Sequence, residues 1–436
     1  MDALIAAFTV LGLLALTLGA GLWIFTSLLI VGGVSLWLVM GQSPDRIGTI
    51  ASGILFRYAS SWELASIPMF VWMGEIIFRT DISARLFRGL APFVERIPGG
   101  LLHTNVLGCT LFAAVSGSSP ATTATVGRIT TAELFRRGYD RNLAVGSIAG
   151  AGSLGLLIPP SIVLIVYGIL AEQSITRLFA SGILPGLMIA SLYAGYVMLR
   201  AWRDPSVAPG APPQRSLRDF GVALLDLLPL FVLMLTVLGS IYSGIATPSE
   251  AAAMGVAASL VVAACLRQLT LRLLRVTILG ALRTSTMICT ILICAAFLST
   301  AMGYMHIPAD VAAAIGGLNL SPYMLLLLLT VFYLGLGVIL DGSSMVVMSL
   351  PIALPLVLQA GFDPIWFGIY LVLMVEMAQI TPPVGFNLFV LQGVTGWSIW
   401  QVARAAFPFF CLMVLGLLLI TIFPDIVLFL PRYLYG

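Results

Sequence analysis

Apolar runs of about 20 residues, the length that a helix needs to cross a bilayer, recur along the whole chain. Inside a bilayer each backbone N–H and C=O group must find a partner within the protein, so only helices and closed barrels can span it. The runs lack the period-two alternation of barrel strands. Charged residues make up only 9% of the 436 residues, against about 25% in soluble domains. The sequence therefore predicts an all-α polytopic membrane protein.

The remaining composition excludes several function classes. The basic residues are all arginine and gather in a few loops, which indicates membrane topology and no nucleic-acid partner. The chain has two histidines, and its five cysteines lie in apolar runs without a CxxC pair. We find no HExxH, phosphate-binding-loop or GxSxG motif. We therefore expect no enzyme activity, no cofactor and no metal other than a coupling ion.

Three short motifs occur twice in the same order along the chain. They are GSS at Gly117–Ser119 and Gly342–Ser344, GYD or GFD at Gly138–Asp140 and Gly361–Asp363, and LIPPS or ITPPV at Leu157–Ser161 and Ile380–Val384. The copies lie 225, 223 and 223 residues apart. The repetition predicts two related halves, residues 1–200 and 221–436, joined by a polar linker over residues 201–220.

The arginines indicate how the two halves are oriented. Four of them follow the first GSS motif, at Arg128, Arg136, Arg137 and Arg141, whereas the matching loop around 359–364 has none. The polar stretch Arg200–Arg218, which contains most of the linker, has four more. Because basic residues favour the cytoplasm, the first loop and the linker are predicted to be cytoplasmic, and the second loop and the N-terminus periplasmic. Asp2 and the absence of basic residues indicate that the N-terminal run is a membrane helix and not a cleaved signal peptide. Opposed halves form an inverted repeat, which is typical of secondary transporters.

Each half is predicted to contain scaffold helices, an interfacial arm, a re-entrant hairpin and a broken helix. The predicted hairpins cover about 98–136 and 323–358, and the broken helices about 142–170 and 364–395. The arms are Gln42–Arg57 and the stretch that carries Arg267, Arg272, Arg275 and Arg283. They either link a fixed scaffold to a moving domain or are ordinary interfacial helices.

The two GSS motifs are the predicted hairpin tips. In SGSSP, Ser118 or Ser119 can cap a second arm that has Pro120 in its first turn. Hydroxyl and freed carbonyl oxygens suit a cation such as Na⁺, whereas free N–H groups at a helix start favour an anion. In the second tip, Asp341 stands where the first has Ser116. Asp341 either binds a coupling ion or proton, or caps the second arm.

Paired prolines interrupt a long apolar run in each half and release backbone carbonyls. We expect each break to face the hairpin tip of its own half, which gives two pseudo-symmetric cation sites; a simple proline kink is the alternative. The predicted Na⁺ ligands are Ser116, Gly117, Ser118, Ser119, Gly152, Ser153 and Pro159 in the first site, and Asp341, Gly342, Ser343, Ser344, Thr381, Pro382 and Gly385 in the second.

Polar residues beside the tips are candidate substrate contacts. They are Ser119, Thr122, Thr123, Thr125, Pro160, Ser161, Gln379 and Asn387. Part of the threonine run can instead bond to carbonyls of its own helix. Glu376 either partners a hydroxyl or titrates, and Thr247–Glu250 is predicted to form a capping box.

The segments SGSSPATTATVG, AGSLGLLIPPS, TPSEAA and ITPPVGFNLFV together resemble the large membrane (DctM-like) subunit of tripartite ATP-independent periplasmic (TRAP) transporters. The family's hairpin tips correspond to Ser116–Ser119 and Asp341–Ser344, and its unwound segments to Gly152–Pro160 and Thr381–Asn387. Met374 and Ala378 stand where the family often has Asn and Gly.

The resemblance implies a Na⁺-driven elevator of inverted-repeat ion-transporter fold in the lipids of a bacterial inner membrane. In the family, a small membrane subunit strengthens the scaffold and a periplasmic binding protein delivers an organic acid. We expect the small subunit to be a separate four-helix chain, and the substrate to be a dicarboxylate, keto acid, sialic acid or similar acid. The alternatives are a stand-alone Na⁺ or H⁺ coupled anion transporter of similar fold and, less in keeping with broken helices in inverted halves, an ion channel.

Overall fold

The computed structural model describes residues 3–208, 215–316, 321–337, 340–383 and 385–436. All regular elements in these ranges are helices, which confirms the all-α prediction. Residues 209–214 of the predicted linker, residues 338 and 339 of the predicted second hairpin, and Val384 of the second double-proline segment lie outside the described residues.

The first half of the chain contains ten α-helices, considering the described residues alone. They are α1 (Ala3–Gly19), α2 (Ile24–Met40), α3 (Pro44–Ala59), α4 (Ser66–Phe78), α5 (Ile82–Val94), α6 (Leu102–Ser116), α7 (Ser119–Arg136), α8 (Arg141–Ser153), α9 (Ile162–Leu170) and α10 (Ile175–Arg203).

The second half contains eleven α-helices within the described residues. Its helices are α11 (Leu217–Met234), α12 (Ser240–Tyr242), α13 (Pro248–Cys265), α14 (Leu271–Tyr304), α15 (Ile307–Gly316), α16 (Pro322–Leu336), α17 (Gly342–Gln359), α18 (Pro364–Gln379), α19 (Phe386–Thr395), α20 (Ile399–Ile422) and α21 (Asp425–Tyr435). A π-helical turn over Leu235–Gly239 joins α11 to α12. Six helical segments of the described chain are long and apolar enough to cross a membrane, so the protein is a multi-pass membrane protein.

The two halves differ at the predicted arms. In the first half, α3 ends at Ala59 and is followed by the C-cap residue Ser60, whose hydroxyl donates to the carbonyls of Phe56 and Arg57. A 3₁₀ turn at Glu63–Ala65 then precedes α4. In the second half the arm is not a separate helix. Its arginines from Arg272 to Arg283 lie in the first part of α14, which continues to Tyr304 without a break.

The predicted capping box is confirmed at the start of α13. The Thr247 hydroxyl accepts a hydrogen bond from the Glu250 N–H at 3.4 Å, and the Glu250 carboxylate accepts from the Thr247 N–H at 2.8 Å. These bonds satisfy two donors that a helix start would otherwise leave free.

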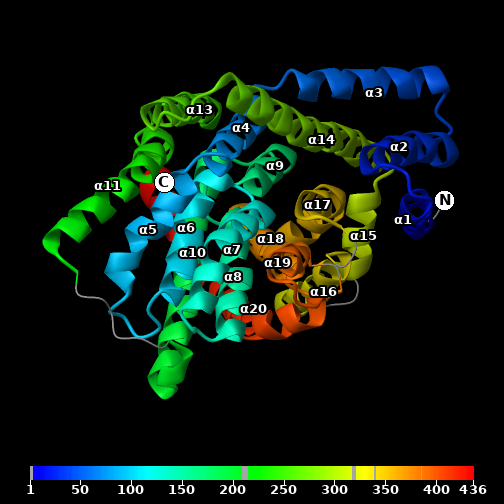
Figure 1. Ribbon diagram of the computed structural model, residues 1–436. Helices are drawn as coiled ribbons and strands as arrows, with labels where there is room; N and C mark the ends of the chain where they lie inside the picture. The colour runs from blue at the N-terminus through cyan, green and yellow to red at the C-terminus, as the bar shows by residue number, and fades with distance from the viewer. Residues whose placement is uncertain (1–2, 209–214, 317–320, 338–339, 384) are drawn as a thin grey trace.

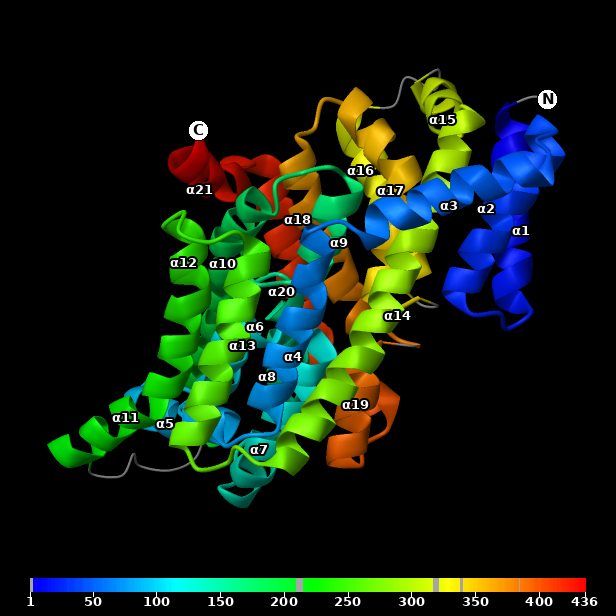
Figure 2. The ribbon, with the colours of Figure 1, turned by 90° about the horizontal axis from the view of Figure 1, so that it is seen from above.

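Three helices form one layer beside the hairpins. Helix α4 packs between α13 and α14, and α14 also packs along α2. Figures 1 and 2 show α4, α13 and α14 on one side of the molecule, with the hairpins α6–α7 and α16–α17 and the broken helices beside them. We refer to α4 and α14 as the wall, because they face the hairpin tips.

Helix α18 lies at the centre of the molecule. All its residues from Ile365 to Gln379 are buried. A helix that is apolar on every face must be covered on every face, and α10, α16, α17 and α20 contact it. Helix α8 is also covered by neighbouring helices over most of its length, and its glycines let their backbones come close. A Cβ atom built on Gly146 would lie 2.1 Å from the carbonyl oxygen of Ala405 in α20.

We predict that Gly146→Ala lowers the melting temperature of the purified protein in detergent, because the new methyl group must push α8 away from the α20 backbone. Gly195→Ala in α10 is the matched control, since nothing lies within 4 Å of a Cβ built there. In that helix interior, alanine is favoured over glycine by about 1 kcal/mol, so its melting temperature should stay equal or rise. Equal behaviour of the two variants would contradict the close contact between α8 and α20.

Candidate functional site

The first hairpin tip is the turn between α6 and α7. Gly117 has φ +60°, a left-handed conformation that favours glycine. The Ser116 hydroxyl lies 2.7 Å from the Thr122 hydroxyl and accepts from the Ser118 N–H at 3.5 Å, and the Thr122 hydroxyl donates to the Ser118 carbonyl at 2.8 Å. Ser118 is the N-cap residue of α7 but makes no side-chain capping bond. The tip is therefore closed by bonds among its own hydroxyls and backbone.

This tip packs directly on the first broken helix. A Cβ on Gly117 would lie 3.0 Å from the Pro160 carbonyl oxygen, and one on Gly155 would lie 2.9 Å from the Ser118 carbonyl oxygen. A Cβ on Gly152 would likewise lie too close to Thr123, so glycine at this position makes room for the threonine. The expectation that the break faces the tip of its own half is confirmed here, because glycines on both sides allow the two backbones to meet.

The second tip begins α17. The Asp341 carboxylate accepts from the backbone N–H groups of Ser343 at 3.1 Å and Ser344 at 3.3 Å, and also from the Ser344 hydroxyl. Asp341 therefore caps the second arm, one of the two roles predicted for it; cation binding stays a prediction. Gly342 faces Val375 and Gln379 of α18, so this tip also meets the broken helix of its own half.

The broken helices have matching interruptions. In the first, α8 ends at Ser153, a 3₁₀ turn covers Leu154–Leu156, and α9 begins after Ser161, whose hydroxyl accepts from the Leu164 N–H at 3.3 Å. In the second, α18 ends at Gln379 and α19 begins at Phe386. Both Pro–Pro peptide bonds are cis. The hydroxyls of Ser153 and Thr381 donate to carbonyls of their own helices, at 2.7 and 2.6 Å.

A cavity of about 510 Å³ lies where the two tips meet the wall. The tips contribute Ser116, Gly117, Ser118, Asp341, Gly342 and Ser343, and the breaks contribute Leu156 and Gln379. Val71, Gly74, Glu75 and Phe78 of α4, with Thr284, Met287 and Ile288 of α14, form much of the other side. Residues of both predicted cation sites therefore line the same cavity.

The predicted substrate contacts divide around this cavity. Gln379 lines it. The others are not among the residues that line it: Ser119, Thr122, Thr123, Thr125, Pro160, Ser161 and Asn387. Of these, Ser119 and Asn387 are fully buried behind the first tip, where the Asn387 amide donates to the Ser119 hydroxyl at 2.7 Å. This bond joins residues 268 positions apart and ties the first tip to the second broken helix.

Several buried oxygens in this region lack a hydrogen-bond donor. They are both carboxylate oxygens of Glu376, Gln379 Oε1 and Asn387 Oδ1. The Glu376 carboxylate is directed toward the backbone N–H groups of Leu156 and Leu157 at the first break but forms no hydrogen bond to either, so it lies between the two broken helices. Oxygen acceptors without donors are the atoms that a hard cation needs, so the chemistry of this region fits a Na⁺ ion.

Glu75 was missed by the sequence analysis. It lies on α4, and its Oε2 accepts a hydrogen bond from Arg79 Nε at 2.9 Å. The available signal was an acidic residue inside the apolar run MFVWMGEIIF, since carboxylates at membrane depth are functional candidates. The repeat drew attention to the tips, and α4 is not part of either one.

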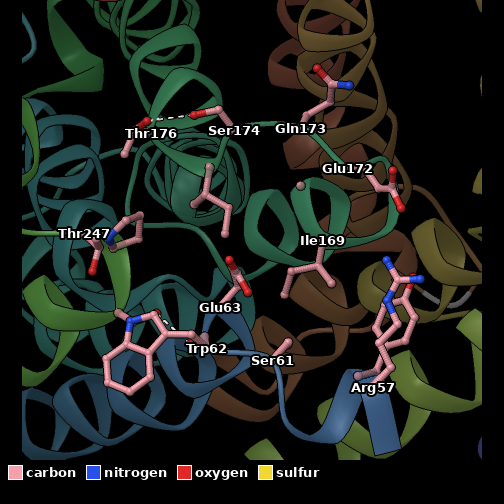
Figure 3. A pocket seen from close by; sticks show the side chains of 15 residues that line it. Arg57, Ser61, Trp62, Glu63, Ile169, Glu172, Gln173, Ser174, Thr176 and Thr247 are labelled. Atoms are coloured by element: carbon pink, nitrogen blue, oxygen red, sulfur yellow. Dashed lines mark hydrogen bonds between the residues drawn. The ribbon is translucent and has the colours of Figure 1, made fainter. Parts of the chain in front are cut away.

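A second cavity, of about 660 Å³, lies away from the tips, where the end of α3, the α9–α10 connection and the start of α13 meet. Figure 3 shows Arg57, Glu63 and Glu172 around it, together with Trp62 and the hydroxyls of Ser174 and Thr247. None of the predicted ion or substrate residues lines it.

Comparisons with known proteins agree with this arrangement. The chain matches the family described as "Tripartite ATP-independent periplasmic transporter, DctM component" over residues 11–426. It is 36% identical over 395 residues to the C4-dicarboxylate TRAP transporter large permease protein DctM of Pseudomonas aeruginosa, which covers 90% of this chain and 91% of that protein.

Two further proteins extend the comparison. The isethionate TRAP transporter permease protein DctMQ of Oleidesulfovibrio alaskensis is 33% identical over 451 residues, covering 97% of this chain and 70% of that protein. The solved structure of the YdaH transporter of Alcanivorax borkumensis has a TM-score of 0.62 at 15% identity, over 88% of this chain and 90% of that one. At that identity the likeness concerns the fold, and it supports the predicted transporter fold.

We predict that Ser119 and Asn387 are energetically coupled. In a double-mutant cycle of Ser119→Ala and Asn387→Ala, the coupling free energy of unfolding should be about 1 kcal/mol, the net value of a buried hydrogen bond. Denaturant titration of the purified protein gives these energies. Thr395→Ala replaces Asn387→Ala in the control cycle, because the Thr395 hydroxyl in α19 donates only within its own helix. Additive effects in both cycles would rule out the bond between the halves.

Proposed function

Because the chain belongs to the DctM component family of TRAP transporters, we propose that it is the permease subunit of a Na⁺-coupled secondary transporter that imports an organic acid. The observation that carries this proposal is the cavity shared by both hairpin tips. A solute in that cavity contacts the residues that would hold the coupling ions, so binding of one favours binding of the other.

The residues around the tips would hold Na⁺ and the solute together. Ser116, the carbonyl of Pro160, Asp341 and Thr381 supply oxygens of the kind that bind a hard cation. Bound Na⁺ would supply positive charge beside a carboxylate substrate. The positive ends of the α7 and α17 helix dipoles lie at the tips, which favours an anion, and at the start of α17 the Asp341 carboxylate already accepts from the Ser343 and Ser344 N–H groups.

The proposed movement is that of an elevator. The tips and breaks pack on each other through glycines and are joined by the Asn387–Ser119 bond, so they are suited to move as one body. The wall of α4 and α14 would stay fixed. In this proposal the cavity opens alternately to each side of the membrane as the body slides along the wall.

The partners follow from the family proposal. A periplasmic binding protein would deliver the acid, and a small membrane subunit on a separate chain would strengthen the wall. This chain matches only 70% of the length of the DctMQ relative, which is therefore the longer protein. The relatives' names specify C4-dicarboxylate and isethionate, so the acid of this chain is proposed only as a small organic anion. The N-terminus would be periplasmic and the arginine-rich linker cytoplasmic, in a bacterial inner membrane.

The test is Na⁺-dependent uptake by the chain and its partners in proteoliposomes, with Asp341→Asn as the variant. Asparagine caps a helix about as well as aspartate, so the substitution keeps the start of α17 and removes the charge. We expect the stimulation of uptake by a Na⁺ gradient to fall about tenfold or more, since a lost charged contact costs about 1.5–3 kcal/mol.

Asp45→Asn, at the exposed start of α3, is the control and should retain Na⁺ stimulation. Unchanged stimulation in Asp341→Asn would refute the ion-binding role. Uptake by the chain without any partner protein would favour the stand-alone transporter.

A further inference from the structure

The charge of the residues that line the cavity between the tips and the wall is unusual for a site that accepts an anion. Two carboxylates line it, Glu75 from α4 and Asp341 from the start of α17. No Arg, Lys or His is among the described residues that line it. A solute that carries only negative charge would therefore meet two acidic side chains and no basic one.

The two carboxylates are not in equivalent surroundings. Asp341 is held by the backbone and hydroxyl donors of its own helix start, and in the proposed function a coupling ion neutralises it. Glu75 belongs to the wall, away from the ion-binding segments. Its carboxylate is paired with Arg79 and not with a proposed coupling ion.

The position of Glu75 is built into the contact between α4 and α14. A Cβ on Gly280 of α14 would lie 2.7 Å from Glu75 Oε2, so glycine at this position makes room for the carboxylate. Arg79 engages that same oxygen from outside the cavity and has a side chain that is 43% exposed. Ion pairs with an exposed partner are weak, so a second cation in the cavity can compete with Arg79 for the Glu75 carboxylate.

We propose that the transported acid carries a cationic nitrogen and that Glu75 recognises it, which makes the substrate a zwitterion such as an amino acid or a betaine. This inference rests on the proposed function. The carboxylate of the solute would lie toward the helix starts and bound Na⁺ at the tips, and its ammonium group toward α4. An ammonium–carboxylate contact is a charge-assisted hydrogen bond and is stronger than a neutral one.

The inference is tested with pairs of acids that differ by one amino group: propionate and β-alanine, succinate and L-aspartate, glutarate and L-glutamate. Each compound is titrated into the purified chain in NaCl at pH 7, and its stabilisation of the protein is followed by thermal melting. We expect the amino acid of at least one pair to bind about tenfold more tightly than its partner, the scale of one charge-assisted contact.

Glu75→Gln should abolish that preference and leave binding of the acid without nitrogen equal or improved. A merely structural role would weaken both members of a pair. Glu63→Gln is the matched control, because Glu63 lies in the cavity of Figure 3 and should keep the preference.

Equal binding within every pair, or a preference that survives Glu75→Gln, would overturn the inference and leave the proposed function standing. Stabilisation by none of the six compounds would also overturn it, while Na⁺-driven uptake decides the proposed function separately.

Discussion

A helix that breaks inside an apolar bundle leaves backbone N–H and C=O groups that only the protein can satisfy. Each half of this chain breaks one helix at a Pro–Pro pair and turns one hairpin at a Gly-Ser-Ser tip. The structure places the two features of a half in contact: Gly117 and Gly155 let the backbones meet in the first half, and Gly342 makes room for the Val375 and Gln379 side chains in the second. Polar residues of both tips and Gln379 of the second broken helix line one cavity, so the segments that meet at the centre also form its polar site.

The two tips meet this requirement differently because one residue differs. Asp341 caps its own helix, so α17 starts at Gly342, whereas Ser116 reaches only the Ser118 N–H and α7 starts later, at Ser119. An aspartate carboxylate accepts several donors at once, but a serine hydroxyl has fewer lone pairs to offer. The first tip thus relies on the added hydroxyl of Thr122, and the second carries a full negative charge. The two cation sites proposed at these tips therefore differ in charge.

The sequence was most informative where function depends on local chemistry. Repeated prolines and glycines predicted both breaks and both tips, because these residues act on their own backbone. Contacts between distant segments left no comparable pattern. The Asn387–Ser119 bond crosses from one half to the other, while Glu75 became part of the site only because α4 packs beside the tips. Likewise, the arm and the following helix merge into α14, which runs without a break from Leu271 to Tyr304, whereas α3 ends at Ala59 and a separate helix follows.

The wall and the tips meet through a different kind of contact from those that join the tips to the breaks. Side-chain hydrogen bonds of the described residues connect α4 to α14, as between Trp72 and Thr277, and connect the first tip to α19, but none joins the wall to either tip. At one contact between them, Gly74 of α4 lies against the first tip, and a Cβ built on it would lie 3.3 Å from the Ser116 carbonyl oxygen. Apolar and glycine surfaces can slide without breaking directional bonds, whereas hydrogen-bonded pairs cannot. The distribution of hydrogen bonds therefore divides the molecule along the cavity, which is the plane that the proposed movement requires.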